Sequence, residues 1–257
     1  MGSTGADTSQ DELTVLITGF GAFKKDFPVN PSWEIAKELP EYLPPLRAKT
    51  RAAGATSDDA APYLPPVRLL VHPEAIHVSY DVVRDLVPGL WDLDRQLHPE
   101  RPKIDVAVHI GMAGPRPYYS IERRGHRDGY AMKDVDGKFL NDTERRLRQG
   151  KDWVWEDAPK ELLTDLDIDD VLKRWKKYSP NDADLRVSED AGRYLCDFIY
   201  FSSLAHLDKA GEPLNVIFLH VPSDSTDQAV TLGKDLLLQL VRSIAESEVA
   251  RRALRKK

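Results

Sequence analysis

The sequence predicts a single α/β domain, an α/β/α sandwich with a largely parallel central sheet. Three short, nearly continuous apolar segments carry this prediction, because segments of this kind form buried parallel strands: Leu13–Phe20, Ile104–Gly114 and Leu214–Pro222. Helical patterns lie between them. Strands that alternate with helices favour a parallel sheet with helices on both faces.

The elements follow one another along the chain. Leu13–Phe20 reads "LTVLITGF", an apolar run with β-branched residues. The next helix begins in "NPSWEIAKEL", where Asn30 suits the N-cap and the proline after it suits the first helical position. We expect a strand in "AIHVSY" (75–80) and an amphipathic helix over most of 80–97. The last helix begins near Asp227 and has a basic end, which suits the helix dipole.

The predicted domain spans residues 13–245. Residues 1–12 are expected to be a disordered tail, and residues 246–257 a basic helix end or tail. The stretch 48–66 is small, charged and proline-containing, and is interpreted as a loop insertion. The stretch 141–181 is charged, bears tryptophans and has no clean period, so we interpret it as a peripheral insertion.

Composition limits the classes of function. The 257 residues are 41% hydrophobic, which is enough for a sizeable core. A formal net charge of -6 argues against nucleic acid or an anionic membrane as the main partner. One cysteine cannot form an internal disulfide, and neither a signal peptide nor a membrane-spanning segment is evident. We therefore expect a cytoplasmic protein.

Unusual side chains follow the ends of the predicted strands. Phe20 and Phe23 follow the first strand, Glu122 follows the second, and His220 lies near the end of the third. Ligands of open α/β sheets bind outside the carboxyl ends of the strands, so we expect these groups at one edge. Cys196 lies in the helix that precedes the third strand. Cysteine, histidine and acid together would form the constellation of a thiol hydrolase.

Each of these residues also has a plainer interpretation. A single cysteine in a helix is usually core filler, His220 can be a satisfied strand histidine, and Glu122 can neutralise an arginine beside it. Asn30 can be only a cap, and the phenylalanines only core. Cys196, however, lies off the apolar stripe of its helix, one turn after Gly192, a poor helix residue. A helix that begins after this glycine would place the thiol in its opening turns, where the dipole lowers a thiol pKa.

Four blocks, in this order, resemble one family: "TGFGAF…VNPSWE", "VHIGMAG…SIERRGHRDGY", "EDAGRYLCDFIYFSSL" and "IFLHVP". Together they resemble the pyroglutamyl-peptidase I family, cysteine omega-peptidases that remove an N-terminal pyroglutamate, and the last two blocks look most like its eukaryotic branch. The blocks are spread over Leu13–Pro222, most of the chain. The resemblance implies pyroglutamyl peptides as substrates and the α/β/α sandwich that the strand pattern already predicts.

The resemblance also implies roles for particular residues. The nucleophile of the family falls on Cys196 in "AGRYLC", the base on His220 in "HVP", and the acid on Glu122 in "SIER". Pocket residues of the family fall on three further positions, Phe20, Phe23 and Asn30. No cofactor or metal is implied, and the histidines and the cysteine lack the spacing of zinc ligands.

Two departures from the family leave alternatives open. Lys24 and Lys25 stand where members commonly carry two glycines near the substrate, and both insertions look longer than in bacterial relatives. One alternative is a catalytically silent relative that binds pyroglutamyl peptides or a partner protein. Another is a cysteine amidase that acts on a different lactam or acyl group. Oligomeric state, physiological substrate and the preferred second residue stay open.

Overall fold

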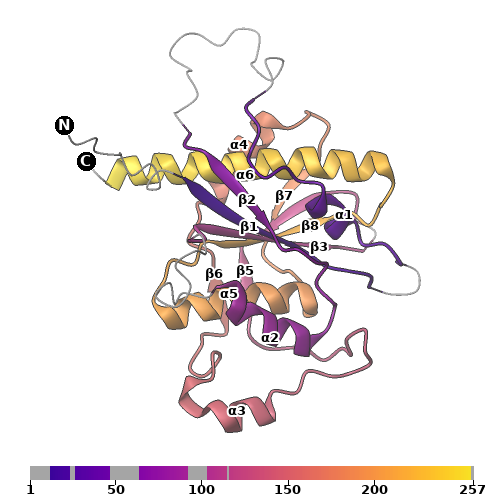
Figure 1. The fold of residues 1–257 in the computed structure, drawn as a ribbon, viewed down its shortest axis with the longest axis vertical. Coiled ribbons are helices and arrows are strands. Elements are labelled where there is room, and N and C mark those ends of the chain that lie inside the picture. The colour runs from indigo at the N-terminus through magenta and orange to yellow at the C-terminus, as the bar shows by residue number, and fades with distance from the viewer. Residues whose placement is uncertain (1–11, 24–26, 47–63, 92–102, 115, 256–257) are drawn as a thin grey trace, which may run out of the picture.

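The structure, a computed structural model, describes residues 12–23, 27–46, 64–91, 103–114 and 116–255. A six-stranded sheet in the order β2–β1–β3–β8–β4–β7 lies between two layers of helices (Figure 1). Its strands are β1 (Leu13–Gly19), β2 (Val67–Val71), β3 (Val106–Met112), β4 (Tyr119–Glu122), β7 (Leu185–Ser188) and β8 (Val216–Val221). The predicted α/β/α sandwich is confirmed.

The sheet is parallel except at one pairing. β2, β1, β3 and β8 pair in parallel, and so do β4 and β7, whereas β4 runs antiparallel to β8. The carboxyl ends of β1, β3 and β8 therefore lie at one edge of the sheet, where sites of α/β proteins are built.

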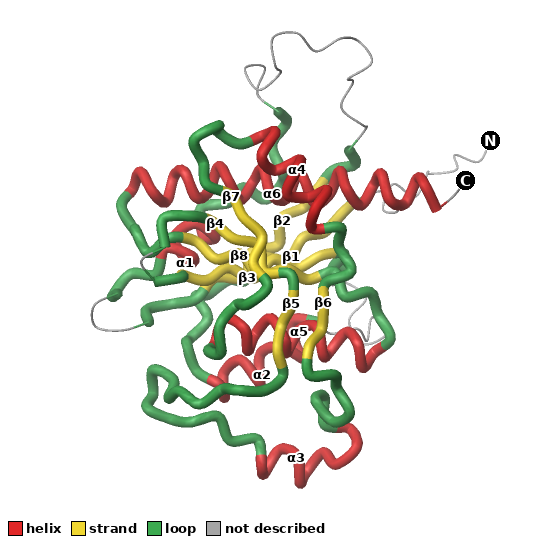
Figure 2. The backbone as a smooth tube through the Cα atoms, turned by 180° about the vertical axis from the view of Figure 1, so that it is seen from behind, coloured by secondary structure: helices red, strands yellow, loops and turns green. Residues whose placement is uncertain are grey.

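The two layers differ in their helices. On one face lie α1 (Pro31–Lys37), α4 (Ile168–Tyr178) and α6 (Asp227–Arg255). On the other lie α2 (Tyr80–Leu90), α5 (Leu195–Ala210) and the strand pair β5 (Arg124–His126) and β6 (Glu161–Leu163), with α3 (Thr143–Gln149) and the short helical turn η4 (Gly150–Asp152) outside them (Figures 1 and 2). Strand side chains alternate between the layers. In β8, Ile217 and Leu219 join the cluster of α6, while Phe218 joins the cluster of α5.

The expected helices are present, and one expected strand is wrong. α1 begins after Asn30, whose side chain accepts from the N–H of Ser32, and α2 and α6 form where the pattern placed them. Residues 75–80 form no strand, since only Ile76 makes an isolated bridge, to Phe20. Their apolar residues pack with α2. The strand that pairs with β1 at this side of the sheet is β2, which the sequence did not predict.

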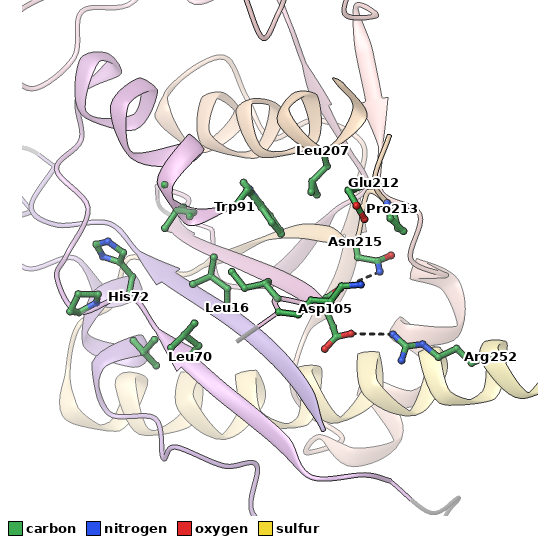
Figure 3. Close-up of a pocket in the computed structure, with 16 residues that line it drawn as sticks. Leu16, Leu70, His72, Trp91, Asp105, Leu207, Glu212, Pro213, Asn215 and Arg252 are labelled. Carbon is green, nitrogen blue, oxygen red and sulfur yellow. Dashed lines mark hydrogen bonds and ion pairs between the residues drawn. The ribbon is translucent and has the colours of Figure 1, made fainter. Parts of the chain in front are cut away.

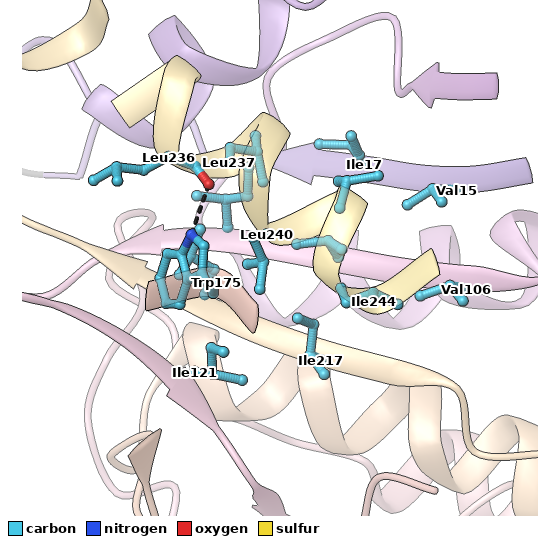
Figure 4. Packing of buried hydrophobic residues seen from close by; sticks show 14 of the residues in the cluster. Val15, Ile17, Val106, Ile121, Trp175, Ile217, Leu236, Leu237, Leu240 and Ile244 are labelled. Carbon is cyan, nitrogen blue, oxygen red and sulfur yellow. Dashed lines mark hydrogen bonds between the residues drawn. The ribbon is translucent and has the colours of Figure 1, made fainter. Parts of the chain in front are cut away.

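Residues 141–181 are not peripheral along their whole length. The segment contains α4, and Trp175 in that helix is fully buried and donates its indole N–H to the carbonyl of Leu236 at 2.8 Å (Figure 4). Ile168 and Val171 are buried beside it. This buried apolar face of α4 was difficult to recognise in the sequence, because charged residues fill the exposed side of the same helix.

The first part of this segment is fixed to the α2–α5 layer by Arg84. Its guanidinium lies 3.6 Å from the ring centre of Trp155 and 4.4 Å from that of Phe198. It also pairs with Asp142 at 2.6 Å. The segment is thus joined to the helix that carries Cys196.

Several predictions lie outside the described part of the chain: most of the 1–12 tail, most of the 48–66 insertion, and Lys24 and Lys25. The predicted domain limits stay a prediction. α6 continues to Arg255, through most of the 246–257 stretch that is predicted to be a helix end or tail. None of the helices that the structure describes has the length and apolarity to cross a membrane.

Candidate active site

The strongest contact at the predicted site joins Glu122 to His220. The Nδ1 atom of the imidazole lies 2.7 Å from Oε1 of the carboxylate, and both side chains are almost fully buried. Ser120 donates its hydroxyl to the same carboxylate oxygen at 3.2 Å. An ionised carboxylate only accepts, so Nδ1 carries the hydrogen of this bond, and in the neutral imidazole Nε2 has the lone pair.

Strand register explains why these side chains meet. His220 in β8 is paired with Ser120 in β4, and Glu122 is paired with Phe218. Because β4 and β8 are antiparallel, Glu122 and His220 lie on one face of the sheet, one diagonal step apart. The sequence placed Glu122 after the second strand, whereas the structure places it at the end of β4.

The absence of a side chain at Gly111 leaves room for the Cys196 sulfur beside His220. In the parallel pairing of β3 with β8, Gly111 lies opposite His220. A Cβ atom at Gly111 would lie 2.9 Å from the sulfur of Cys196 and 2.6 Å from the ring of Phe218. The sulfur therefore occupies the space that a side chain beside His220 would take, and the predicted cysteine, histidine and acid converge.

Helix α5 begins where the glycine predicts. Gly192 has a φ of +86°, a left-handed conformation that ends the preceding loop, and α5 starts at Leu195 after Tyr194 as N-cap. Cys196 is thus in the first turn, as expected. The first helical hydrogen bond runs from Phe198 to the carbonyl of Tyr194, so the earlier N–H groups lie outside the ladder.

The expected lowering of the thiol pKa is wrong. Burial raises the pKa of Cys196 to about 12, and the negative charges of Glu122 and Asp197 raise it further, although the backbone N–H of the cysteine opposes this shift. The resting cysteine is a neutral thiol that needs a base to remove its proton.

Aromatic residues and Asn30 form the neighbourhood that the sequence assigned to a substrate ring. Phe20 is buried, and Phe23 packs edge-on against Tyr194, with ring centres 5.5 Å apart. The Asn30 Oδ1 atom accepts from the N–H and hydroxyl of Ser32, while Nδ2 donates to the carbonyl of Gly21 at 2.9 Å. Asn30 is therefore a helix cap that also fixes the loop between the phenylalanines.

Comparison with known proteins identifies the family. The family model described as pyroglutamyl peptidase matches residues 93–239. Human pyroglutamyl-peptidase 1 is 30% identical over 215 residues, which are 80% of this chain and 84% of the relative. The chain belongs to the pyroglutamyl peptidase family. Pyrrolidone-carboxylate peptidase of Pyrococcus furiosus is 25% identical over 210 residues, which cover 82% of this chain and 81% of that one.

Solved structures share the fold. A mutant pyrrolidone carboxyl peptidase of Pyrococcus furiosus superposes with a TM-score of 0.62 at 21% identity and covers 93% of this chain and 99% of its own. The pyrrolidone carboxyl peptidase of Thermococcus litoralis gives 0.63 at 19% identity, with coverage of 90% and 93%. The family is one of cysteine peptidases, which agrees with a thiol at the centre of the site.

Sequence reading missed two buried polar groups behind the site of this family member. His109, fully buried, lies 2.8 Å from the hydroxyl of Thr18 and 2.8 Å from that of Ser203, and burial lowers its pKa to about 3. It stays neutral and ties β1, β3 and α5 together. Asp197, directly after the cysteine, is also fully buried. A histidine within an apolar strand was the only available signal for the first, and none marked Asp197 as buried.

A cavity among the described residues lies away from the predicted site. It encloses about 560 Å³ near the amino ends of β3 and β8, between Leu16, Trp91, Leu207 and Asn215 (Figure 3). None of the predicted site residues lines it. Within the described ranges, no group of three or more His, Cys, Asp and Glu side chains is arranged to hold a metal ion.

We predict that Gly111→Ala lowers kcat/KM for a pyroglutamyl amide by at least about tenfold, since overpacking at this point must displace the sulfur or Phe218. The measurement is fluorogenic turnover alongside thermal unfolding. Gly89→Ala is the matched control, because a Cβ there meets nothing within 4 Å. Unchanged kcat/KM in the folded Gly111 variant would show that the sulfur does not need this position.

Proposed function

We propose that this chain removes N-terminal pyroglutamate from peptides, with Cys196 as nucleophile, His220 as general base and Glu122 as orienting acid. The supporting observation is the 2.7 Å bond between His220 and Glu122 beside the glycine that admits the Cys196 sulfur. Family membership supplies the substrate class, since the relatives are named for this activity.

The proposed reaction begins from a neutral Cys196 thiol and a neutral His220 imidazole. His220 Nε2 takes the proton of the Cys196 thiol as the sulfur attacks the amide carbonyl, and Glu122 stabilises the imidazolium. The tetrahedral intermediate collapses when the imidazolium gives its proton to the leaving amine, which frees the shortened peptide and leaves a thioester. Water, deprotonated by the same imidazole, then releases pyroglutamate and restores the thiol.

Backbone N–H groups of the first turn of α5 are the proposed oxyanion donors. They lie outside the helical ladder, because the first helical bond is made by Phe198. The dipole of a 16-residue helix adds a partial positive charge at the same point. We therefore propose that the start of α5 stabilises the oxyanion of the transition state more than it stabilises a thiolate in the resting enzyme.

The proposed ring pocket comprises Phe20, Phe23, Tyr194 and Asn30. Pyroglutamate is a neutral lactam, so aromatic walls and a few amide groups suit it. Asn30 uses one Nδ2 hydrogen on Gly21, and we assign the other to the lactam carbonyl. We also propose the cytoplasm as the compartment, where a functional thiol stays reduced, with neither nucleic acid nor a membrane surface as partner.

Removing the triad residues tests the proposal. Cys196→Ala and His220→Ala should each lower kcat by about 10⁴ or more, and the double variant should lose little more, because nucleophile and base act as one unit. Glu122→Gln should lower kcat less than either of these two single variants does. His77→Ala is the control, since this exposed histidine also pairs with a carboxylate, Asp136, at 2.8 Å.

The outcomes separate the alternatives. Additive losses at Cys196 and His220 would contradict a coupled pair. A wild-type chain that binds pyroglutamyl peptides without turnover would be the silent relative instead. Turnover of other lactams or acyl groups, and none of pyroglutamyl amides, would identify a different cysteine amidase.

Selectivity tests the ring pocket. We predict that a pyroglutamyl anilide is cleaved about 10⁴-fold faster, in kcat/KM, than the matched prolyl anilide, because proline lacks the lactam oxygen and brings an ammonium into an aromatic site. Asn30→Ala should lower this ratio, whereas Phe23→Ala should weaken the binding of both anilides. A wild-type ratio below about 10² is no more than an apolar pocket achieves and would contradict the model.

A further inference from the structure

The buried Asp197 joins the start of α5 to the chain around β5. Its Oδ1 atom lies 3.2 Å from the backbone nitrogen of His126 and 3.3 Å from Nδ1 of the same residue. Its Oδ2 atom lies 3.0 Å from the hydroxyl of Tyr130. Asp197 follows the proposed nucleophile directly, so these contacts hold the first turn of the nucleophile helix from the side.

Counting hydrogens in this cluster shows where a proton belongs. The Tyr130 hydroxyl has one hydrogen and two oxygen neighbours, the carbonyl of His126 at 2.5 Å and Asp197 Oδ2 at 3.0 Å. If the hydroxyl donates to the nearer carbonyl, Asp197 can bond to Tyr130 only by donating a hydrogen of its own. A protonated Asp197 therefore satisfies its contacts with both His126 and Tyr130, whereas an ionised one competes with the carbonyl for the single hydrogen of Tyr130.

Other groups around Asp197 bear on its charge. Burial raises the pKa of Asp197 to about 6, although His126, Tyr130 and Arg193 favour the ionised form. Arg193 lies 3.8 Å from Oδ2, and His126 faces Glu161 of β6 at 3.9 Å. Further titratable neighbours among the described residues are Cys196 and Tyr200 on α5 and, beyond Tyr130, Arg84 on α2. Asp190 pairs with Arg193 at 2.5 Å. Burial thus outweighs His126, Tyr130 and Arg193 and moves the pKa of the Asp197 carboxyl towards neutral pH.

We propose that Asp197 is a positioning residue that acts through Cys196: its protonated form bonds to His126 and Tyr130 and fixes the first turn of α5, and its ionised form hinders formation of the thiolate. The charge of Asp197 is one of the two that raise the pKa of the Cys196 thiol. The peptidase thereby gains an ionisable group that sets its pH range without touching the substrate. This inference rests on the proposed role of Cys196 as nucleophile.

Asp197→Asn is the deciding variant, because an amide reproduces the protonated carboxyl. Its oxygen can accept from His126, and its NH₂ group can donate to the Tyr130 oxygen. We expect this variant to fold, to keep kcat/KM within about tenfold of wild type, and to ionise its thiol about one pH unit lower. Asp197→Ala removes the acceptor of the His126 backbone N–H and Nδ1 and one of the two partners of the Tyr130 hydroxyl. It should lose more than about tenfold in kcat without the rescue that Asn gives.

The readout is the rate of iodoacetamide alkylation from acid to alkaline pH, followed by mass spectrometry on the intact full-length chain. Cys196→Ala supplies the unlabelled blank. Glu246→Gln is the matched control, since it removes another buried carboxylate that bonds to a tyrosine, Tyr178, on the opposite face of the sheet. Its alkylation midpoint should equal that of the wild type.

Three results would overturn the inference: an Asp197→Asn variant that does not fold, one as inactive as Asp197→Ala, or one with the wild-type alkylation midpoint. A lower midpoint in the Asn variant alone, with activity kept, supports it. Failure of the proposed function can be distinguished from failure of this inference. Full turnover by Cys196→Ala would show that Cys196 is not the nucleophile, whereas the alkylation midpoints would still report the effect of Asp197 on the thiol.

Discussion

The pairing of β8 with β3 on one side and β4 on the other is the constraint on which the site depends. It places His220 between Gly111 and Ser120, two residues too small to fill the space around an imidazole. The glycine leaves room for a sulfur, and the antiparallel β4 returns Glu122 to within 2.7 Å of the ring. A shift of one residue in either pairing would turn the participating side chains to the opposite face.

Burial then decides the electrostatics. Desolvation and two neighbouring carboxylates keep the thiol neutral at rest, although it lies at a helix start. The low dielectric that disfavours the thiolate also strengthens the bond between His220 and Glu122. In the proposed reaction, charge therefore appears only as the reaction proceeds, when the imidazolium, the start of α5 and the N–H groups of its first turn stabilise it together. Asp197 adds a second carboxylate behind the proposed nucleophile, outside the proposed triad.

The sequence carried most of the strand and helix pattern and the family, but not the features that depend on tertiary contacts. Apolar runs revealed β1, β3 and β8, and Gly192 marked the start of α5, because these are local signals. Residues 75–80 alternate like a strand, but their burial comes from packing with α2. The stripe of α4 was masked by charges. The rise in the thiol pKa was unpredictable, since it arises first from burial by segments distant in sequence and then from the charge of Glu122.

The central claim is that Cys196 becomes acylated during turnover. The most direct measurement is acid quench of the enzyme mixed with a pyroglutamyl ester, followed by peptide mapping. We predict one pyroglutamyl group per chain, held as a thioester on the peptide that contains Cys196, and none on Cys196→Ala. Turnover with no adduct on Cys196, or with an adduct on another residue, would contradict the account.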